Sequence, residues 1–293
     1  MLDFEKLPSY LSPSSLMTAE DMPNTFYLNR LINDKMDKDP QGIAAAVGSA
    51  FDYFIKAKLV ETKFPYKADI LPLLKEGIET NKAEALRMGS KAYSAYVESA
   101  YEEDEYENIE LRLTKEVEGV PLTGYLDATS KIITTEDYNE IFQSTMTYND
   151  IVIPMDWKTT GYSSKSPVSP PPGYFKMFEG LMRRPSHDDF HPDMPFETIN
   201  PKWATQLCTY GWLMDYPVGT PFHARLDTLV WKNNAIRCIA RYYGLISERF
   251  QEHVMMRYKR LWKSLMDGSF KLLLKSQDDE NIIWLASKLE TWY

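Results

Sequence analysis

Residues 151–160 read Ile-Val-Ile-Pro-Met-Asp-Trp-Lys-Thr-Thr. A short apolar run, 151–155, is followed by an acid, Asp156, and a lysine, Lys158. The β-branched residues of this run are typical of a strand that enters a buried sheet. Asp156 and Lys158 are two positions apart, so on a strand their side chains leave the same face. A second stretch, Gly124-Tyr125-Leu126-Asp127, also ends in an acid. If the two strands pair, Asp127 is expected to meet Asp156 and Lys158.

Two carboxylates and an ammonium group at a strand end suit a hard divalent metal ion. Mg²⁺ binds through oxygen ligands, usually one or two carboxylates together with water and substrate phosphate. The lysine would orient the attacking water or help to deprotonate it, while the metal stabilises the developing phosphate charge. The alternative is an Asp–Lys pair on a solvated strand face, and for Asp-x-Lys alone this is the commoner arrangement.

Four short motifs follow one another along the chain. Gly48-Ser49-Ala50-Phe51-Asp52 lies on an expected helix over 43–59, where Gly48 would allow another element to approach closely. Gly124 to Asp127 and Asp156-Trp157-Lys158 follow on expected strands. Gln206-Leu207-Cys208-Thr209-Tyr210 comes last, on an expected helix over 203–214. In this order the set resembles the PD-(D/E)XK nuclease superfamily, in particular its RecB-like and phage-type exonuclease branch.

The resemblance covers about residues 10 to 265 and implies a divalent-metal-dependent deoxyribonuclease. By this resemblance Asp127 and Asp156 would bind Mg²⁺ or Mn²⁺, and Asp52 would complete the site directly or through water. The backbone carbonyl of Trp157 is a further ligand in relatives. Because clustered acids repel one another, at least one is expected to have a raised pKa without metal.

The supporting residues are also implied by the resemblance. Lys158 would position the nucleophilic water, and Gln206 and Tyr210, which share a helix face, would contact the metal-site water, backbone or DNA phosphate. A satisfied buried polar pair is the alternative for Gln206 and Tyr210, and it does not exclude the supporting role. Glu116, on an expected strand over 109–120, is a conceivable extra ligand.

Three functions remain open at this point. The leading expectation is an exonuclease of recombination, repair or phage type. The same site in a structure-specific or restriction-type endonuclease would cut within a strand. A non-catalytic DNA-binding or assembly subunit that retains the fold is the third.

The expected architecture is α/β, with a central mixed sheet of about four to six strands flanked by helices, in a restriction-endonuclease-like core. We expect one domain over 1–293. Its parts would be an N-terminal helical part (1–107), a catalytic core (108–266) with a long insertion (161–201), and a C-terminal helical cap (267–293).

Composition narrows the class of protein. The 293 residues are 44% hydrophobic and 13% aromatic, which allows a substantial core. No apolar run approaches the roughly 20 residues needed to span a bilayer, and the N-terminus lacks the pattern of a signal peptide. The expectation is a cytoplasmic protein, from a bacterial or phage-infected cell, with no membrane partner.

Cysteine usage and charge exclude two further possibilities. Only Cys208 and Cys238 are present, too few for the four-cysteine iron–sulfur cluster of some RecB-like nucleases. Met22 stands where such relatives place their first cysteine. The net charge of −9 argues against non-specific coating of nucleic acid, although a local basic groove remains compatible with it.

DNA, single- or double-stranded, is the expected partner, and a homo-oligomer or a recombination or replication protein stays open. The insertion is too rich in proline for a regular helix or a central strand. Its basic residues are interleaved with aromatic ones and could embrace a nucleic-acid strand. A helix over 248–266 carries further cations, and an ordinary solvated face is the alternative there. The predicted nucleic-acid-binding residues are Lys165, Lys176, Arg183, Arg184, Arg257 and Arg260.

Overall fold

The computed structural model describes most of the chain between residues 7 and 270. The described residues are 7–31, 43–76, 78, 82–98, 106–132, 151–161, 175–178, 181–183, 196–198, 200–232 and 235–270. Most of the predicted insertion and C-terminal cap therefore lie outside the described residues.

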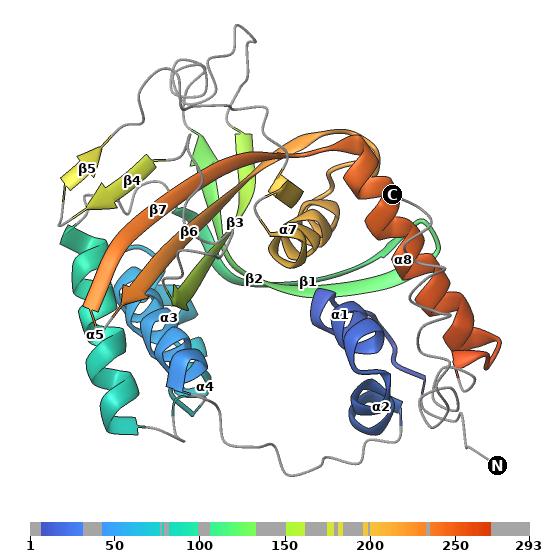
Figure 1. Cartoon of the computed structure of the whole chain (residues 1–293), viewed down its shortest axis with the longest axis horizontal. Helices are drawn as coiled ribbons and strands as arrows, with labels where there is room; N and C mark the ends of the chain where they lie inside the picture. The colour runs from blue at the N-terminus through green and yellow to red at the C-terminus, as the bar shows by residue number, and fades with distance from the viewer. Residues whose placement is uncertain are drawn as a thin grey trace, which may run out of the picture.

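A seven-stranded sheet forms the centre of the molecule (Figure 1). Its strands, in spatial order, are β1 (Tyr106–Val117), β2 (Val120–Ile132), β3 (Ile151–Gly161), β6 (Phe222–Lys232), β7 (Ala235–Ile246), β4 (Phe175–Phe178) and β5 (Leu181–Arg183). β3 and β6 run parallel, and every other neighbouring pair is antiparallel. The expected α/β fold with a mixed sheet is confirmed.

The strand count exceeds the expected four to six because the insertion contributes two short strands. β4 and β5 pair with each other, and β4 adds to β7 at one end of the sheet. Neither β4 nor β5 contains a proline, so both strands keep the backbone N–H groups needed for pairing. β4 lies between β7 and β5 and pairs with both, so the expectation that this stretch forms no strand inside the sheet is wrong for Phe175–Phe178.

Helices cover both faces of the sheet (Figure 1). In chain order they are α1 (Pro13–Asp21), α2 (Pro23–Phe26), α3 (Ile43–Thr62), α4 (Ile70–Glu76), α5 (Lys82–Glu98), α7 (Pro201–Leu213) and α8 (Glu248–Met266). Ser12, Asn200 and Ser247 cap α1, α7 and α8, each accepting a hydrogen bond from a backbone N–H of the first turn. None of the described helices is both long and apolar enough to cross a bilayer.

The two sides of the sheet have separate apolar cores. Under α3 and α5, Phe51, Ile55 and Tyr96 pack against Met155 and Trp157 of β3. On the other side, residues of α7 and α8 pack against residues of β2 and β6; they include Leu207, Leu213, Val254, Leu122, Leu126 and Leu226. The central strands are thus buried on both faces, which explains the apolar run at the start of β3.

The β1–β2 hairpin changes the core that it faces half-way along its length. Ile109 and Ala128 belong to the core under α3 and α5, whereas Leu111 and Leu126 pack into the core under α7. Residues two apart should share a face, so both strands are irregular at the position between. Glu110 causes part of this irregularity, because its φ of 45° lies in the left-handed region that non-glycine residues rarely adopt.

Two motif glycines lie where a helix touches the sheet. A Cβ on Gly48 would come within 2.8 Å of Thr159 Oγ1, so α3 packs directly on β3 there. A Cβ on Gly124 would lie 2.9 Å from Leu213 Cδ1 and 2.9 Å from Tyr210 Cε1, both on α7. The expectation that Gly48 permits a close approach is confirmed, and Gly124 has the same role on the opposite side.

Replacement of Gly124 by alanine is expected to destabilise the protein by about 1–3 kcal/mol, because the added methyl group overpacks the contact between β2 and α7. Urea unfolding followed by circular dichroism measures this change. A variant as stable as the wild type would show that the two elements can separate without cost.

Candidate metal centre

Three acids lie in one row across neighbouring strands. Ile109 pairs with Ala128 and Leu111 with Leu126, so Glu110 of β1 stands opposite Asp127 of β2. On the other side of β2, Ala128 pairs with Met155, and the same register brings Asp127 to Asp156. No pair beyond Ala128–Met155 forms between β2 and β3 in the described residues, so the acids lie where these two strands separate.

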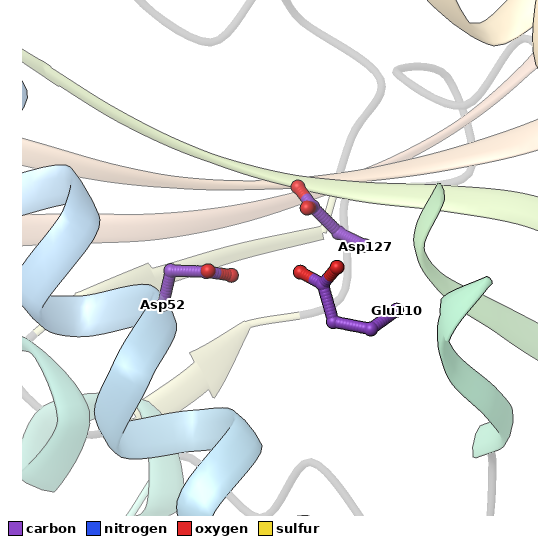
Figure 2. A group of neighbouring side chains, drawn as sticks. All are labelled: Asp52, Glu110 and Asp127. Carbon is purple, nitrogen blue, oxygen red and sulfur yellow. The ribbon is translucent and has the colours of Figure 1, made fainter. Parts of the chain in front are cut away.

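Helix α3 supplies a fourth acid. Figure 2 shows Asp52 pointing from the helix toward Glu110 and Asp127. One carboxylate oxygen from each of these three residues lies within 4.8 Å of the other two, so the group could hold a metal ion. Of the predicted ligands, Asp52 and Asp127 belong to this group. Asp156 lies beside it, and Glu110 joins it without having been predicted.

A buried lysine lies among the three carboxylates. Lys56 Nζ is 2.8 Å from Asp52 Oδ2 and 3.0 Å from Asp127 Oδ1, and it also forms an ion pair with Glu110. The Lys56 side chain has no exposed surface. Burial would lower its pKa, but the charges of Asp127, Asp52 and Glu110 outweigh burial and raise the pKa above its ordinary value.

Asp156 and Lys158 form the expected pair. Lys158 Nζ lies 2.5 Å from Asp156 Oδ2, and the side chains are 24% and 1% exposed, lysine first. A solvated strand-face pair would be exposed on both sides, so that alternative is wrong. The pair lies inside the protein, beside Asp127, where charge interactions are stronger than in water.

The pKa values of the acids diverge because the acids are buried together. Burial raises the pKa of Asp52 to about 7, and the charges of Asp127 and Glu110 add to this. Burial also raises the pKa of Asp156 well above its usual range. Burial acts the same way on Asp127, but the ammonium groups of Lys56 and Lys158 outweigh it, and its pKa is lowered. The expected rise is confirmed, with burial as the larger cause and repulsion the smaller.

A buried polar network holds β3 from behind the acids. The indole Nε1 of Trp157 donates to Tyr96 Oη at 3.1 Å, and Tyr96 donates to Asp227 at 2.5 Å. Arg225 in turn donates to both oxygens of Asp227, at 3.1 and 2.7 Å. Trp157 stands between Asp156 and Lys158 in sequence and points to the opposite face, so the network fixes the strand segment that carries both.

Helix α7 approaches the acids from the other side. Gln206 Nε2 donates to Tyr210 Oη at 2.7 Å, which confirms that the two share a helix face. Burial raises the pKa of Tyr210, and the nearby carboxylates of Asp156 and Asp127 raise it further. Tyr210 is thus a neutral hydroxyl close to the site. The Gln206–Tyr210 hydrogen bond is the buried polar pair expected as the alternative. The position of Tyr210 beside the acids also suits a role in supporting the site.

A pocket of about 280 Å³ opens between α3 and β3. Its lining includes Asp52, Asp127 and Lys158, with Gly48 and Thr159 at the contact between helix and strand. Asp52, Asp127 and Lys158 are therefore accessible to a ligand of modest size.

The predicted nucleic-acid-binding residues do not gather at the acids in the described part of the chain. Lys176 of β4 and Arg183 of the edge strand β5 are partners in the register of the two strands. Arg257, on α8, forms an ion pair with Glu20 of α1, and Arg260 Nη2 lies 3.4 Å from Met256 Sδ on the same helix. α8 lies at the far end of the molecule from α3 in Figure 1, so neither arginine is brought to the acids. Lys165 and Arg184 lie outside the described residues.

Comparison with known proteins adds little beyond the geometry. No protein-family model matches the chain, and no curated protein sequence matches it. Among solved structures, one from Eubacterium rectale named "Putative exonuclease" is similar over 88% of this chain and 80% of that chain, with a TM-score of 0.49 and 12% identity. At this level the likeness assigns no role to any residue.

Sequence reasoning missed Glu110 and Lys56. Lys56 follows Asp52 by four residues, so helical spacing already puts both on one face and could have indicated the pair. Glu110 has no such local signal, because its position depends on the irregular backbone of β1. Glu116, considered instead, is exposed near the hairpin end and pairs with Pro121, away from the acids.

The chemistry of the donor set fits a divalent cation. Carboxylate oxygens are the ligands that Mg²⁺ and Mn²⁺ prefer. With every group ionised, the four carboxylates and the two lysines Lys56 and Lys158 leave a net charge of two negative units, which one divalent ion offsets. Asp52, Glu110 and Asp127 would hold it, with Asp156 adjoining.

Replacement of Lys56 by methionine should destabilise the protein by about 3 kcal/mol near neutral pH, because three half-buried carboxylates lose the counter-charge of a fully buried ammonium group. The loss should shrink at pH 5, where the carboxylates can take up protons. Urea unfolding of the variant at both pH values measures this.

Lys58→Met is the matched control. Lys58 lies on the same helix and pairs with Glu61 at 3.4 Å on the surface, so its loss should cost less than about 0.5 kcal/mol. Equal effects of the two substitutions would contradict the role given to Lys56.

Proposed function

We propose that this chain is a divalent-metal-dependent nuclease that hydrolyses phosphodiester bonds in DNA. The observation that carries the proposal is the buried Asp156–Lys158 pair beside the carboxylates of Asp52, Glu110 and Asp127, where Asp52, Asp127 and Lys158 line a pocket. The ordered motifs that resemble PD-(D/E)XK nucleases support the same chemistry.

Two features argue against the view that these charged groups serve only to stabilise the fold. Buried acids destabilise a fold unless they are paired. Even a buried ion pair can often be replaced by apolar residues without loss of stability. Here Asp52 and Asp127 also border a pocket large enough for a phosphate group. A site that binds a cation and an anionic substrate accounts for both features.

The roles proposed for these residues come from the resemblance and from their positions. Asp52, Glu110 and Asp127 would hold Mg²⁺ or Mn²⁺ with Asp156 adjoining, and by the resemblance the Trp157 carbonyl would be a further ligand. When bound, the metal would lower the pKa of a coordinated water and stabilise the charge on the phosphate. Lys158 would hold the attacking water through its ammonium group.

Hydrolysis requires the water oxygen to bond to phosphorus while the bond to the leaving oxygen breaks. One proton of the water passes to solvent or to the leaving oxygen. Tyr210 would donate a hydrogen bond to a phosphate oxygen or to the water, and Gln206 would hold the Tyr210 hydroxyl in place through the bond that they share. The finer proposal is an exonuclease, with an endonuclease as the alternative.

Cleavage of linear, nicked and circular DNA with Mg²⁺ tests the proposal. The wild type should degrade linear DNA and spare closed circles, whereas cleavage of circles would favour the endonuclease. Lys158→Ala and Asp156→Asn should each reduce the rate by at least about 100-fold, because each removes a group needed at the reacting phosphate.

Asp215→Asn is the matched control for the acid substitutions. Asp215 is 83% exposed and pairs with Lys115 on the surface, so its loss should leave the rate unchanged. A wild type that cleaves none of these substrates with either metal would sink the nuclease proposal.

Metal binding can be measured without turnover. Mn²⁺ should bind the wild type in isothermal titration calorimetry and raise its melting temperature, since a ligand of the folded state stabilises it. Asp127→Asn should weaken binding by at least about tenfold, because it removes a charged ligand. Equal binding by wild type and variant would place the ion elsewhere.

A second candidate function has one specific observation in its favour. Lys56 already offsets the charge of three carboxylates, so the cluster is stable without metal. This would suit a non-catalytic DNA-binding or assembly subunit. DNA binding by a protein that neither binds Mn²⁺ nor cleaves DNA would identify it.

A further inference from the structure

An exposed arginine and tyrosine stack on the outer surface of the β1–β2 hairpin. The guanidinium carbon of Arg112 lies 5.4 Å from the centre of the Tyr125 ring, within the range of a cation–π interaction. Tyr125 is 54% exposed, which is unusual for a large aromatic side chain held in a regular strand. The two residues face each other in the register of β1 and β2.

This pair lies one step along the hairpin from the acids. Arg112 follows Glu110 by two residues, and Tyr125 precedes Asp127 by two. Residues two apart along an extended strand lie about 7 Å from each other. Leu126 between them is buried under α7, so Tyr125 and Asp127 both point away from that core. A strand of substrate at the acids would therefore continue over the pair.

The charge of Arg112 is available to an anion. Within the described part of the chain Arg112 forms no ion pair, and its one specific contact is the Tyr125 ring. Other cations are differently placed: Arg257 pairs with Glu20 and Lys259 with Glu118. An exposed arginine beside a group of acids suits the phosphate that adjoins the one held at the metal.

We infer that Arg112 and Tyr125 form a binding site for a single-stranded segment of nucleic acid next to the scissile phosphate. Tyr125 stacks on an unpaired base, and Arg112 contacts a neighbouring phosphate. Bases in a duplex are already stacked on both faces, so the site selects an unpaired end. The inference rests on the proposed function, whose substrate form it specifies.

Binding measured without cleavage tests the inference separately. In the Asp156→Asn background with EDTA, fluorescence anisotropy gives the affinity for a labelled oligothymidylate and for a blunt duplex of equal length. Tyr125→Ala should weaken binding of the single strand about tenfold and leave the duplex almost unaffected. Tyr125→Phe, which keeps the ring, should bind within about twofold of the parent.

The salt dependence tests the role of Arg112. Arg112→Ala should reduce the slope of log affinity against log salt by about one, because one phosphate contact is lost. Tyr66→Ala is the control, since Tyr66 is 70% exposed on a separate turn and should not matter.

Unchanged single-strand binding by Tyr125→Ala would overturn the inference, and so would an equal loss in Tyr66→Ala. Either result combined with metal-dependent cleavage by the wild type would leave the nuclease proposal intact. Conversely, Tyr125-dependent binding by a wild type that cleaves nothing would support the binding site and reject the nuclease.

Discussion

The rest of the structure depends on how four carboxylates are kept inside the protein. Asp52, Glu110 and Asp127 gather around Lys56, and Asp156 lies against Lys158. Taking such charges out of water costs several kcal/mol per ion, so each needs a partner in place. The two lysines supply positive charge from different elements, one from a helix and one from a strand. Lys56 ties α3 to β1 and β2 through Glu110 and Asp127, whereas Lys158 pairs with Asp156 within β3.

The strands bend to make room for these groups. Glu110 takes a left-handed backbone conformation, which costs of the order of 1–3 kcal/mol. Lys67, on the turn after α3, donates to the backbone carbonyls of Ile109 and Glu110 at this point. Gly48 and Gly124 let α3 and α7 approach from opposite sides. Backbone strain, close packing of elements and buried charge thus occur together around the acids. Each of these features is unfavourable by itself, as is common at functional sites.

The surface cations divide into two kinds. Those of α8 hold elements together, since Arg257 binds Glu20 of α1 and Lys259 binds Glu118 at the β1–β2 turn. Arg112 instead lies beside an aromatic ring, one step from the acids. A cation that joins two elements is less available to phosphate than one that stacks on an exposed ring. The number of cations along a helix therefore indicates less about nucleic-acid binding than the interaction that each cation makes.

The sequence by itself determined the local parts of this protein. Strand periodicity and the two-residue spacing place Asp156 and Lys158 on one face, and helical spacing does the same for Gln206 and Tyr210, because these relations depend only on backbone geometry. The tertiary structure alone decided that Glu110 joins the acids. Its contacts come from strand register and a local change of backbone conformation, which depend on residues far apart in the chain and leave no periodic signal.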